Sequence, residues 1–148
     1  MRLLLISNST NPGEPYLDYP KQNIMEFLGS GHVKALFIPY AVVTFSFDDY
    51  EIKVRDRFSE IGNDVISIHH YTSPVKAVKK AGGTREQRIQ EFIEVNADLW
   101  VAGIREGTML LIENDKIRLI GPRKARIFRK FHQPLELGEK DDFSFLLK

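Results

Sequence analysis

The apolar positions in the first half of the chain form three short runs, separated by segments with helical spacing. We predict strands over Arg2–Ser7, Val33–Pro39 and Val65–Ile68, because each range is centred on apolar residues. Alternation of buried strands with amphipathic helices is typical of a parallel sheet covered by helices on both faces. The pattern therefore predicts an α/β fold with a mainly parallel, doubly wound sheet.

Two helices are predicted between these strands. The first carries Ile24, Phe27 and Leu28 on one face and stops at the glycines of 29–31. The second begins after Ser46, whose hydroxyl can cap the helix with an aspartate at the third helical position. Its apolar stripe has helical spacing and consists of Tyr50, Val54, Phe58 and Ile61.

The alternation of strands and helices breaks after the third predicted strand. A short basic helical turn over 74–81 leads through Gly82-Gly83 into a capping box formed by Thr84 and Gln87. Two helices therefore follow one another without a strand between them. The apolar face of the second of them consists of Ile89, Phe92 and Ile93.

The last third of the chain predicts further strands. We expect a buried strand over Leu99–Ala102, a hairpin over 108–120 that turns at Asn114-Asp115, and a strand over Ala125–Phe131. The single tryptophan, Trp100, is expected in the core rather than as a stacking platform. The chain ends in an apolar group that we expect to dock onto the body of the protein, namely Phe143, Phe145, Leu146 and Leu147.

The composition limits the classes of function. The chain has 148 residues, the size of a single domain that buries roughly 70% of the surface its unfolded chain exposes. It has no cysteine, which excludes disulfides, thiolate metal sites and a cysteine nucleophile. The 21 basic and 20 acidic residues give a net charge of +1, which argues against a nucleic-acid partner. No targeting or membrane-spanning pattern is present, so we expect a cytoplasmic protein without membrane contact.

Hydroxyl and imidazole groups offer few catalytic candidates. Ser7, Ser9 and Thr10 follow the first strand, at the edge where open α/β sheets bind ligands, but no nucleophile-elbow motif surrounds them. His69 and His70 are adjacent at the end of a predicted strand, where neighbouring side chains point to opposite faces. Such a pair does not easily chelate one ion, and we therefore expect no metal site.

The densest positive patch covers residues 123–130. It can bind an anion or a nucleic acid, with Phe128 and Phe131 as stacking surfaces. The balanced charge of the whole chain favours a different interpretation, in which the basic residues protect an exposed strand edge from pairing.

Five segments, spread over nearly the whole chain, carry a family resemblance. They are residues 3–13, residues 37–44 together with 48–50, the TREQRI sequence of 84–89, the GIREG sequence of 103–107, and Ile120-Gly121-Pro122. In this order they closely resemble the peptidase E family of bacterial α-aspartyl dipeptidases. The resemblance implies a three-layer αβα fold, flavodoxin-like and related to class I glutamine amidotransferase domains. It also implies hydrolysis of small dipeptides with an N-terminal aspartate, by a serine nucleophile, a histidine base and an acidic residue, without a cofactor.

The chain departs from this family in its centre. The family carries a GGGNTF-like strand end, a GWSAG-like nucleophile elbow and an NPH-like segment with the catalytic histidine, and none of the three occurs here. A serine nucleophile needs a base within hydrogen-bond reach and oxyanion donors around it. We therefore predict one peptidase E-like domain over 1–148 with an internal deletion, whose junction lies near 81–84, and no dipeptidase activity.

The resemblance also assigns a few site residues. Glu106 matches the family glutamate that orients the histidine, which makes it a triad acid without its histidine. Arg85, Arg88 and Arg105 are candidates to bind the acidic side chain of a substrate, because guanidinium groups suit carboxylate geometry.

Two alternatives stay open. Loss of central strands exposes apolar sheet edges, which favours a dimerising or binding module without enzymatic activity. The other alternative is that the complete protein holds residues that the 148-residue sequence lacks, in which case it is an active dipeptidase.

Overall fold

The computed structural model describes residues 2–39, 45–70 and 85–147. The chain divides into two compact units, one formed by 1–13 with 81–148 and the other by 14–80. The single domain and its junction near 81–84 stay a prediction, and the helical turn over 74–81 and the cap at Thr84 lie outside the described residues. Within the described ranges, no helix has the length and apolar character needed to cross a membrane.

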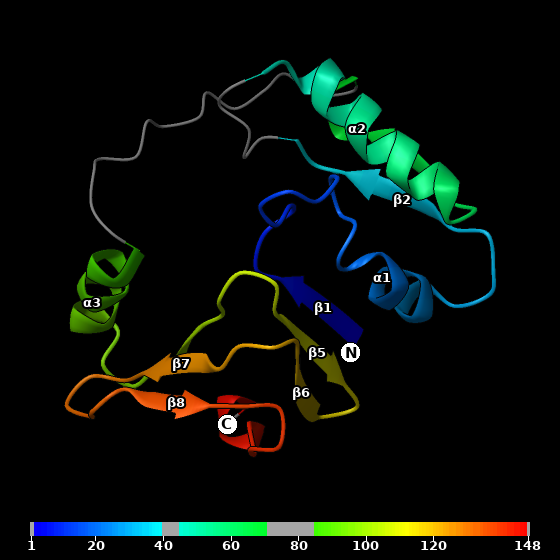
Figure 1. The fold of residues 1–148 in the computed structure, drawn as a ribbon. Helices are drawn as coiled ribbons and strands as arrows, with labels where there is room; N and C mark the ends of the chain where they lie inside the picture. The colour runs from blue at the N-terminus through cyan, green and yellow to red at the C-terminus, as the bar shows by residue number, and fades with distance from the viewer. Residues whose placement is uncertain (1, 40–44, 71–84, 148) are drawn as a thin grey trace. The chain divides into compact units, whose positions relative to one another are not determined.

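The unit of residues 14–80 is built around two parallel strands. Its elements are α1 (Lys21–Leu28), β2 (Lys34–Phe37), α2 (Phe47–Glu60), β3 (Asp64–Ser67) and the 3₁₀ turn η1 (Ile68–His70) (Figure 1). Strand β2 pairs with β3, and Leu36 lies opposite Ile66. The expected strand–helix–strand order is confirmed here, with ends that differ by one or two residues from those predicted.

Helix α2 begins where the sequence indicates. The Ser46 hydroxyl accepts a hydrogen bond from the backbone N–H of Asp49 at 3.0 Å, which caps the first turn. Val54 is buried, and the Tyr50 ring meets the Phe37 ring of β2 edge to face at 4.9 Å. These contacts fix the first turns of α2 against the sheet.

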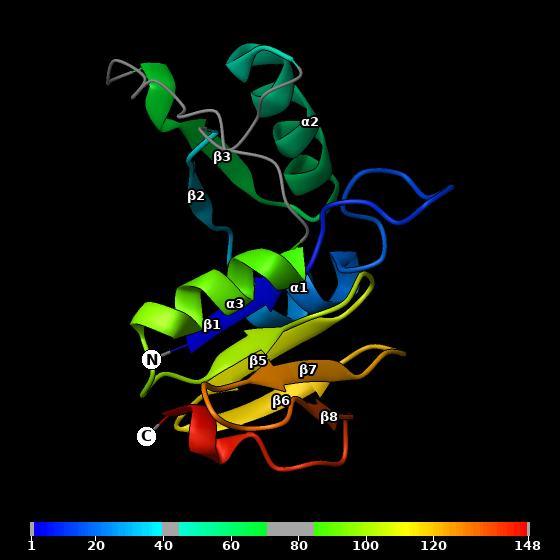
Figure 2. The same cartoon turned by 90° about the vertical axis from the view of Figure 1, so that its left-hand side faces the viewer.

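The other unit contains two antiparallel sheets and a helix. One sheet has the order β1-β5-β6 and the other β4-β7-β8 (Figures 1 and 2). The strands are β1 (Arg2–Ile6), β4 (Val101–Gly103), β5 (Met109–Glu113), β6 (Lys116–Ile120), β7 (Ala125–Phe128) and β8 (Leu135–Leu137), with helix α3 (Arg85–Val95) and the 3₁₀ turn η2 (Ser144–Leu147).

The pairing of these strands differs from the expected sheet. The α/β class is confirmed, but among the described strands four of the five pairings are antiparallel. A mainly parallel sheet is therefore not what the described strands form. Strand β1 pairs with β5 in antiparallel register, with Leu4 opposite Leu111. An apolar run such as Leu3-Leu4-Leu5-Ile6 suits a buried strand of either direction, so the pattern alone does not select its partner.

The hairpin between β5 and β6 is confirmed. Asn114 and Asp115 have φ angles of 47° and 63°, so both central residues of the turn are left-handed. This is the type I′ geometry, whose twist matches that of the flanking strands, and asparagine and aspartate tolerate it better than most residues. This two-residue turn places Glu113 opposite Lys116.

The predicted docking of the C-terminal tail is also confirmed. Phe143 is fully buried, in the same core cluster as Leu119 of β6 and Ile127 of β7. Phe145 and Leu146 pack against the same core, as does Trp100. The core consists of Leu110, Leu119, Ala125, Ile127 and Phe143.

Two details of the sequence interpretation are wrong. Strand β7 lies between β4 and β8, so the basic residues of 123–130 do not protect an exposed strand edge. Helix α3 buries Ile93, but Phe92 is 46% exposed and does not belong to the buried face.

Candidate functional site

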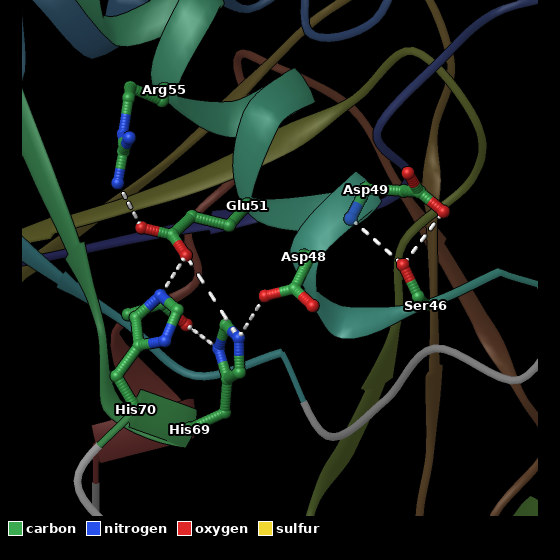
Figure 3. A network of polar contacts seen from close by, with 8 residues as sticks. Ser46, Asp48, Asp49, Glu51, Arg55, His69 and His70 are labelled. Carbon is green, nitrogen blue, oxygen red and sulfur yellow. Dashed lines mark hydrogen bonds and ion pairs between the residues drawn. The ribbon is translucent and has the colours of Figure 1, made fainter.

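The densest group of chemically competent side chains lies in the unit of residues 14–80. Asp48 and Glu51 come from the first turns of α2, three residues apart, and therefore share one face of the helix. His69 and His70 come from η1, directly after β3 ends at Ser67. Figure 3 shows the two imidazole rings facing the two carboxylates. We call these four residues the His–carboxylate cluster.

Short contacts connect all four members of the cluster. The Nε2 atom of His69 lies 3.0 Å from Oδ1 of Asp48 and 4.0 Å from Oε2 of Glu51. The Nε2 atom of His70 lies 2.6 Å from the same Glu51 oxygen. The two rings are 4.0 Å apart between centroids. One ligand atom from each residue therefore falls within 4.8 Å of every other.

Two further side chains hold the cluster in place. The Ser67 hydroxyl lies 2.5 Å from Nδ1 of His69, and Ser67 is fully buried. Arg55, one helical turn after Glu51, donates a hydrogen bond to the other Glu51 oxygen (Figure 3). Both inner members, Glu51 and His69, thus have fixed orientations.

The cluster is buried on one side and open on the other. The side chains of Glu51 and His69 are 5% and 10% exposed, whereas those of His70 and Asp48 are 48% and 75% exposed. The hydrogen bond from His69 holds the pKa of the Asp48 carboxyl below its usual value. Asp48 therefore stays ionised at neutral pH, on the exposed side of the cluster.

The expectation that His69 and His70 point to opposite faces is wrong. They lie in a 3₁₀ turn, where successive side chains are about 120° apart rather than the 180° of a strand. Both rings consequently turn toward α2. The sequence offered a usable signal, since Asp48 and Glu51 have helical spacing just after a confirmed N-cap, but the contact between α2 and η1 was needed to find it.

The family-matched glutamate lies elsewhere, in the unit that contains β1 and β5. Glu106 is exposed in the turn after β4 and, among the described residues, makes no hydrogen bond or ion pair. The turn itself is tied to the end of β1, because the N–H of Gly107 donates to Oδ1 of Asn8 at 3.1 Å and the N–H of Thr108 to the Ser7 hydroxyl at 3.4 Å. No described histidine lies in this turn, so the structure assembles no acid–histidine pair around Glu106.

The three candidate arginines separate into two cases. Arg105 already has a carboxylate partner, because its two Nη atoms lie 2.6 and 2.7 Å from the Glu136 oxygens. This pairing raises the pKa of Arg105 and lowers the pKa of Glu136. Arg85 and Arg88 lie in the first turns of α3, and their side chains are outside the described parts of the structure.

Cations of the 123–130 patch are largely matched by local partners. Arg126 lies 3.5 Å from a Glu86 oxygen, and Lys130 lies 3.0 Å from a Glu94 oxygen, both on α3. Arg129 stacks over the Trp100 ring at 4.9 Å. The two ion pairs join α3 to β7 and the residues that follow it, which is a structural role for the patch.

Helices and mixed strands define this chain as an α/β protein, and sequence comparison refines that class. A family model described as Peptidase family S51 matches residues 3–82, more than half of the chain. The chain belongs to this family.

Several curated relatives are named Peptidase E. The protein of Nostoc sp. is 29% identical over 234 residues, a match that covers 99% of this chain and 97% of the relative. The protein of Streptomyces coelicolor is 26% identical over 235 residues and covers 99% and 95%. The protein of Salmonella newport is 37% identical over 100 residues, which cover 64% of this chain and 43% of the relative. These matches confirm the peptidase E resemblance and support a peptidase-type function.

Proposed function

We propose that this chain is a peptidase E-type scaffold that has lost its catalytic centre through an internal deletion, and that it does not hydrolyse Asp-Xaa dipeptides. The observation that carries the proposal is the length of the match to the Nostoc relative. That match extends over 234 positions and nearly the full length of both proteins, whereas this chain has 148 residues. Both ends of the Nostoc relative thus align with residues of this chain, and the residues of the relative that have no match here lie in its interior.

Two boundaries near residue 82 support the predicted junction. The family model ends at residue 82, and the boundary between the two compact units falls between Lys80 and Ala81. Both points adjoin Gly82-Gly83, where the order of family segments jumps to TREQRI. The proposed parent architecture is the flavodoxin-like three-layer αβα fold. Removal of its central strands would leave β1 free to pair with β5 instead.

Ser67, a described serine that contacts a histidine, does not supply a substitute nucleophile. Ser67, His69 and Asp48 follow one another through hydrogen bonds as in a serine, histidine and aspartate triad. The Ser67 hydroxyl is fully buried, however, and an attacking oxygen must reach the scissile carbonyl of a substrate. The trio is therefore a structural contact, and Glu106 lacks the histidine that it would orient.

A hydrolysis assay tests this proposal. Purified chain, verified by intact mass at 17.1 kDa, is incubated with Asp-Leu, and released aspartate is measured beside a full-length peptidase E as positive control. We expect no release above buffer and no labelling by a fluorophosphonate probe. Turnover that a serine-directed inhibitor abolishes, at this mass, would refute the proposal. A larger intact mass with turnover would instead establish the active-dipeptidase alternative.

A second candidate function is self-association through β2. Leu36 and Ile38 are 62% and 59% exposed, and the second edge of β2 has no strand partner within the described ranges. An unpaired edge with exposed apolar side chains favours pairing with another copy. Sedimentation at high micromolar concentration should show a dimer that Leu36→Lys weakens and Lys116→Glu, on another strand, does not. A clean monomer at that concentration would exclude this function.

A further inference from the structure

We propose that Asp48, Glu51, His69 and His70 form a binding site for one zinc ion. The site lies at the carboxyl end of β3 and the N-terminal turn of α2, and each member supplies one ligand atom (Figure 3). It is separate from the family-matched Glu106, which lies in the other unit. The proposal does not depend on whether the chain hydrolyses peptides.

The donor set selects the class of ion. Two imidazole nitrogens favour zinc and other late first-row metals, whereas magnesium and calcium prefer oxygen ligands alone. The absence of cysteine rules out thiolate ligation and leaves histidine and carboxylate as the strong ligands of the chain. Four ligands of these two types meet the requirement of a tetrahedral zinc site.

The spacing of the donor atoms is close to what zinc requires. Zinc bonds of about 2.0–2.1 Å place tetrahedral donors about 3.3 Å apart. The contacts from His69 Nε2 to Asp48 and Glu51 are 3.0 and 4.0 Å, and that from His70 to Glu51 is 2.6 Å. All four donor atoms lie within 4.8 Å of one another, so the widest separation would have to shorten by about 1.5 Å for the four to surround one ion.

Surrounding contacts prepare the ligands. If Nδ1 of His69 carries the proton and donates it to the Ser67 hydroxyl, Nε2 presents its lone pair to the ion. Arg55 holds the second Glu51 oxygen and leaves Oε2 directed at the histidines. Such outer contacts are the usual support of a metal-bound histidine or carboxylate.

Charge and access also suit a divalent cation. Two carboxylates and Arg55 leave the cluster with a net negative charge when both histidines are neutral. A zinc ion would neutralise the charges of the two carboxylates, and Arg55 would remain paired with the outer Glu51 oxygen. The exposed side chains of Asp48 and His70 give the ion a path from solvent. Ser67 and the buried side of the cluster form its closed end.

Zinc titration calorimetry on the untagged, metal-stripped full chain at pH 7.5 tests the proposal. We expect one saturable site per chain. Asp48→Asn and His70→Ala change exposed ligands and should each lower the zinc affinity by at least about tenfold. Ser67→Ala changes a buried positioning residue and should lower it by about 10–100-fold. His32→Asn is the matched control, because His32 is a histidine paired with one carboxylate, Asp64 at 3.1 Å, outside the cluster.

The visible spectrum of bound Co²⁺ reports directly on the ligands, so it distinguishes a residue that binds the metal from one that only stabilises the fold. Co²⁺ bound by two histidines and two carboxylates should give a tetrahedral visible spectrum, lost in His70→Ala and kept in His32→Asn. Absence of saturable zinc binding would overturn the proposal and leave the cluster as a closed hydrogen-bond network. Binding that Asp48→Asn and His70→Ala leave unchanged, or that His32→Asn removes, would also overturn it. Circular dichroism of each variant verifies that loss of binding does not reflect unfolding.

Discussion

Phe143→Ala tests the docking of the C-terminal tail, on which the core of the unit with β6 and β7 depends. Phe143 is fully buried against Leu119 and Ile127. Truncation of a buried phenylalanine removes its transfer free energy and leaves a cavity, a combined cost of about 3–5 kcal/mol. Whole domains are stable by only about 5–15 kcal/mol, so the change should remove a large part of the total.

The single tryptophan makes this loss measurable. Trp100 packs against the same core, with its ring 4.9 Å from that of Phe145, so its fluorescence reports on the docked tail. Urea unfolding followed at Trp100 should show a much lower midpoint for Phe143→Ala than for the native chain. Phe131→Ala is the matched control, because Phe131 is 90% exposed and its loss should change stability by no more than about 0.5 kcal/mol.

One result would refute the reasoning directly. If Phe143→Ala and Phe131→Ala unfold at the same urea concentration, residue 143 does not lie in a cooperative core. Should Phe143→Ala fail to fold, Phe143→Leu keeps most of the apolar volume and should give an intermediate midpoint. A Phe143→Leu midpoint equal to that of the native chain would count equally against the docked tail.

Three further predictions concern local features. Ser46→Ala removes the cap of α2 and should lower the free energy of unfolding, measured by urea titration, by about 0.5–2 kcal/mol. Ser144→Ala, which changes a serine at a 3₁₀ turn, should lower it by less, and equal losses would contradict the cap. Asp115 has a positive φ, which glycine adopts easily and valine does not. Asp115→Gly should therefore raise the melting temperature and Asp115→Val should lower it, and the reverse order would exclude a type I′ turn. The Gly62 carbonyl and Asp64 raise the pKa of His32 above its usual value of 6.5. The stability that the protonated ring contributes is therefore complete below pH 6.5 and is lost as the pH rises through the pKa of the folded state. His32→Asn should destabilise the protein more at pH 5.5 than at pH 9, and a difference that does not depend on pH would contradict the shift.

Local signals in the sequence predicted the elements well, because caps and turns act over a few residues. The Ser46 cap, the Gly29 helix end and the turn at Asn114-Asp115 all occur where the residue types indicate. Each rests on hydrogen bonds or backbone angles that the neighbouring residues settle by themselves. Strand β8, in contrast, carried no such signal, since Leu135–Leu137 is too short to show an alternating pattern.

Pairing between distant strands was not predictable in the same way. Strand β1 joins β5 more than a hundred residues later, and its apolar run fits a parallel or an antiparallel neighbour equally well. The choice depends on which other strands are present. The alternation of strands and helices carries no information about those partners, which is why it predicted a parallel sheet that the described strands do not form.

The His–carboxylate cluster forms because β3 ends at Ser67 rather than at Ile68. Ligands of open α/β sheets collect at the carboxyl ends of strands, and the sequence argument applied this rule to Ser7 after the first strand. The same rule applies after β3, where His69 and His70 follow Ser67, but extension of the strand to Ile68 suggested that the histidines diverge. The strand ends one residue earlier, and the 3₁₀ turn brings both rings to the acidic face of α2. An adjacent histidine pair just beyond a parallel strand should therefore be tested against both geometries before chelation is dismissed.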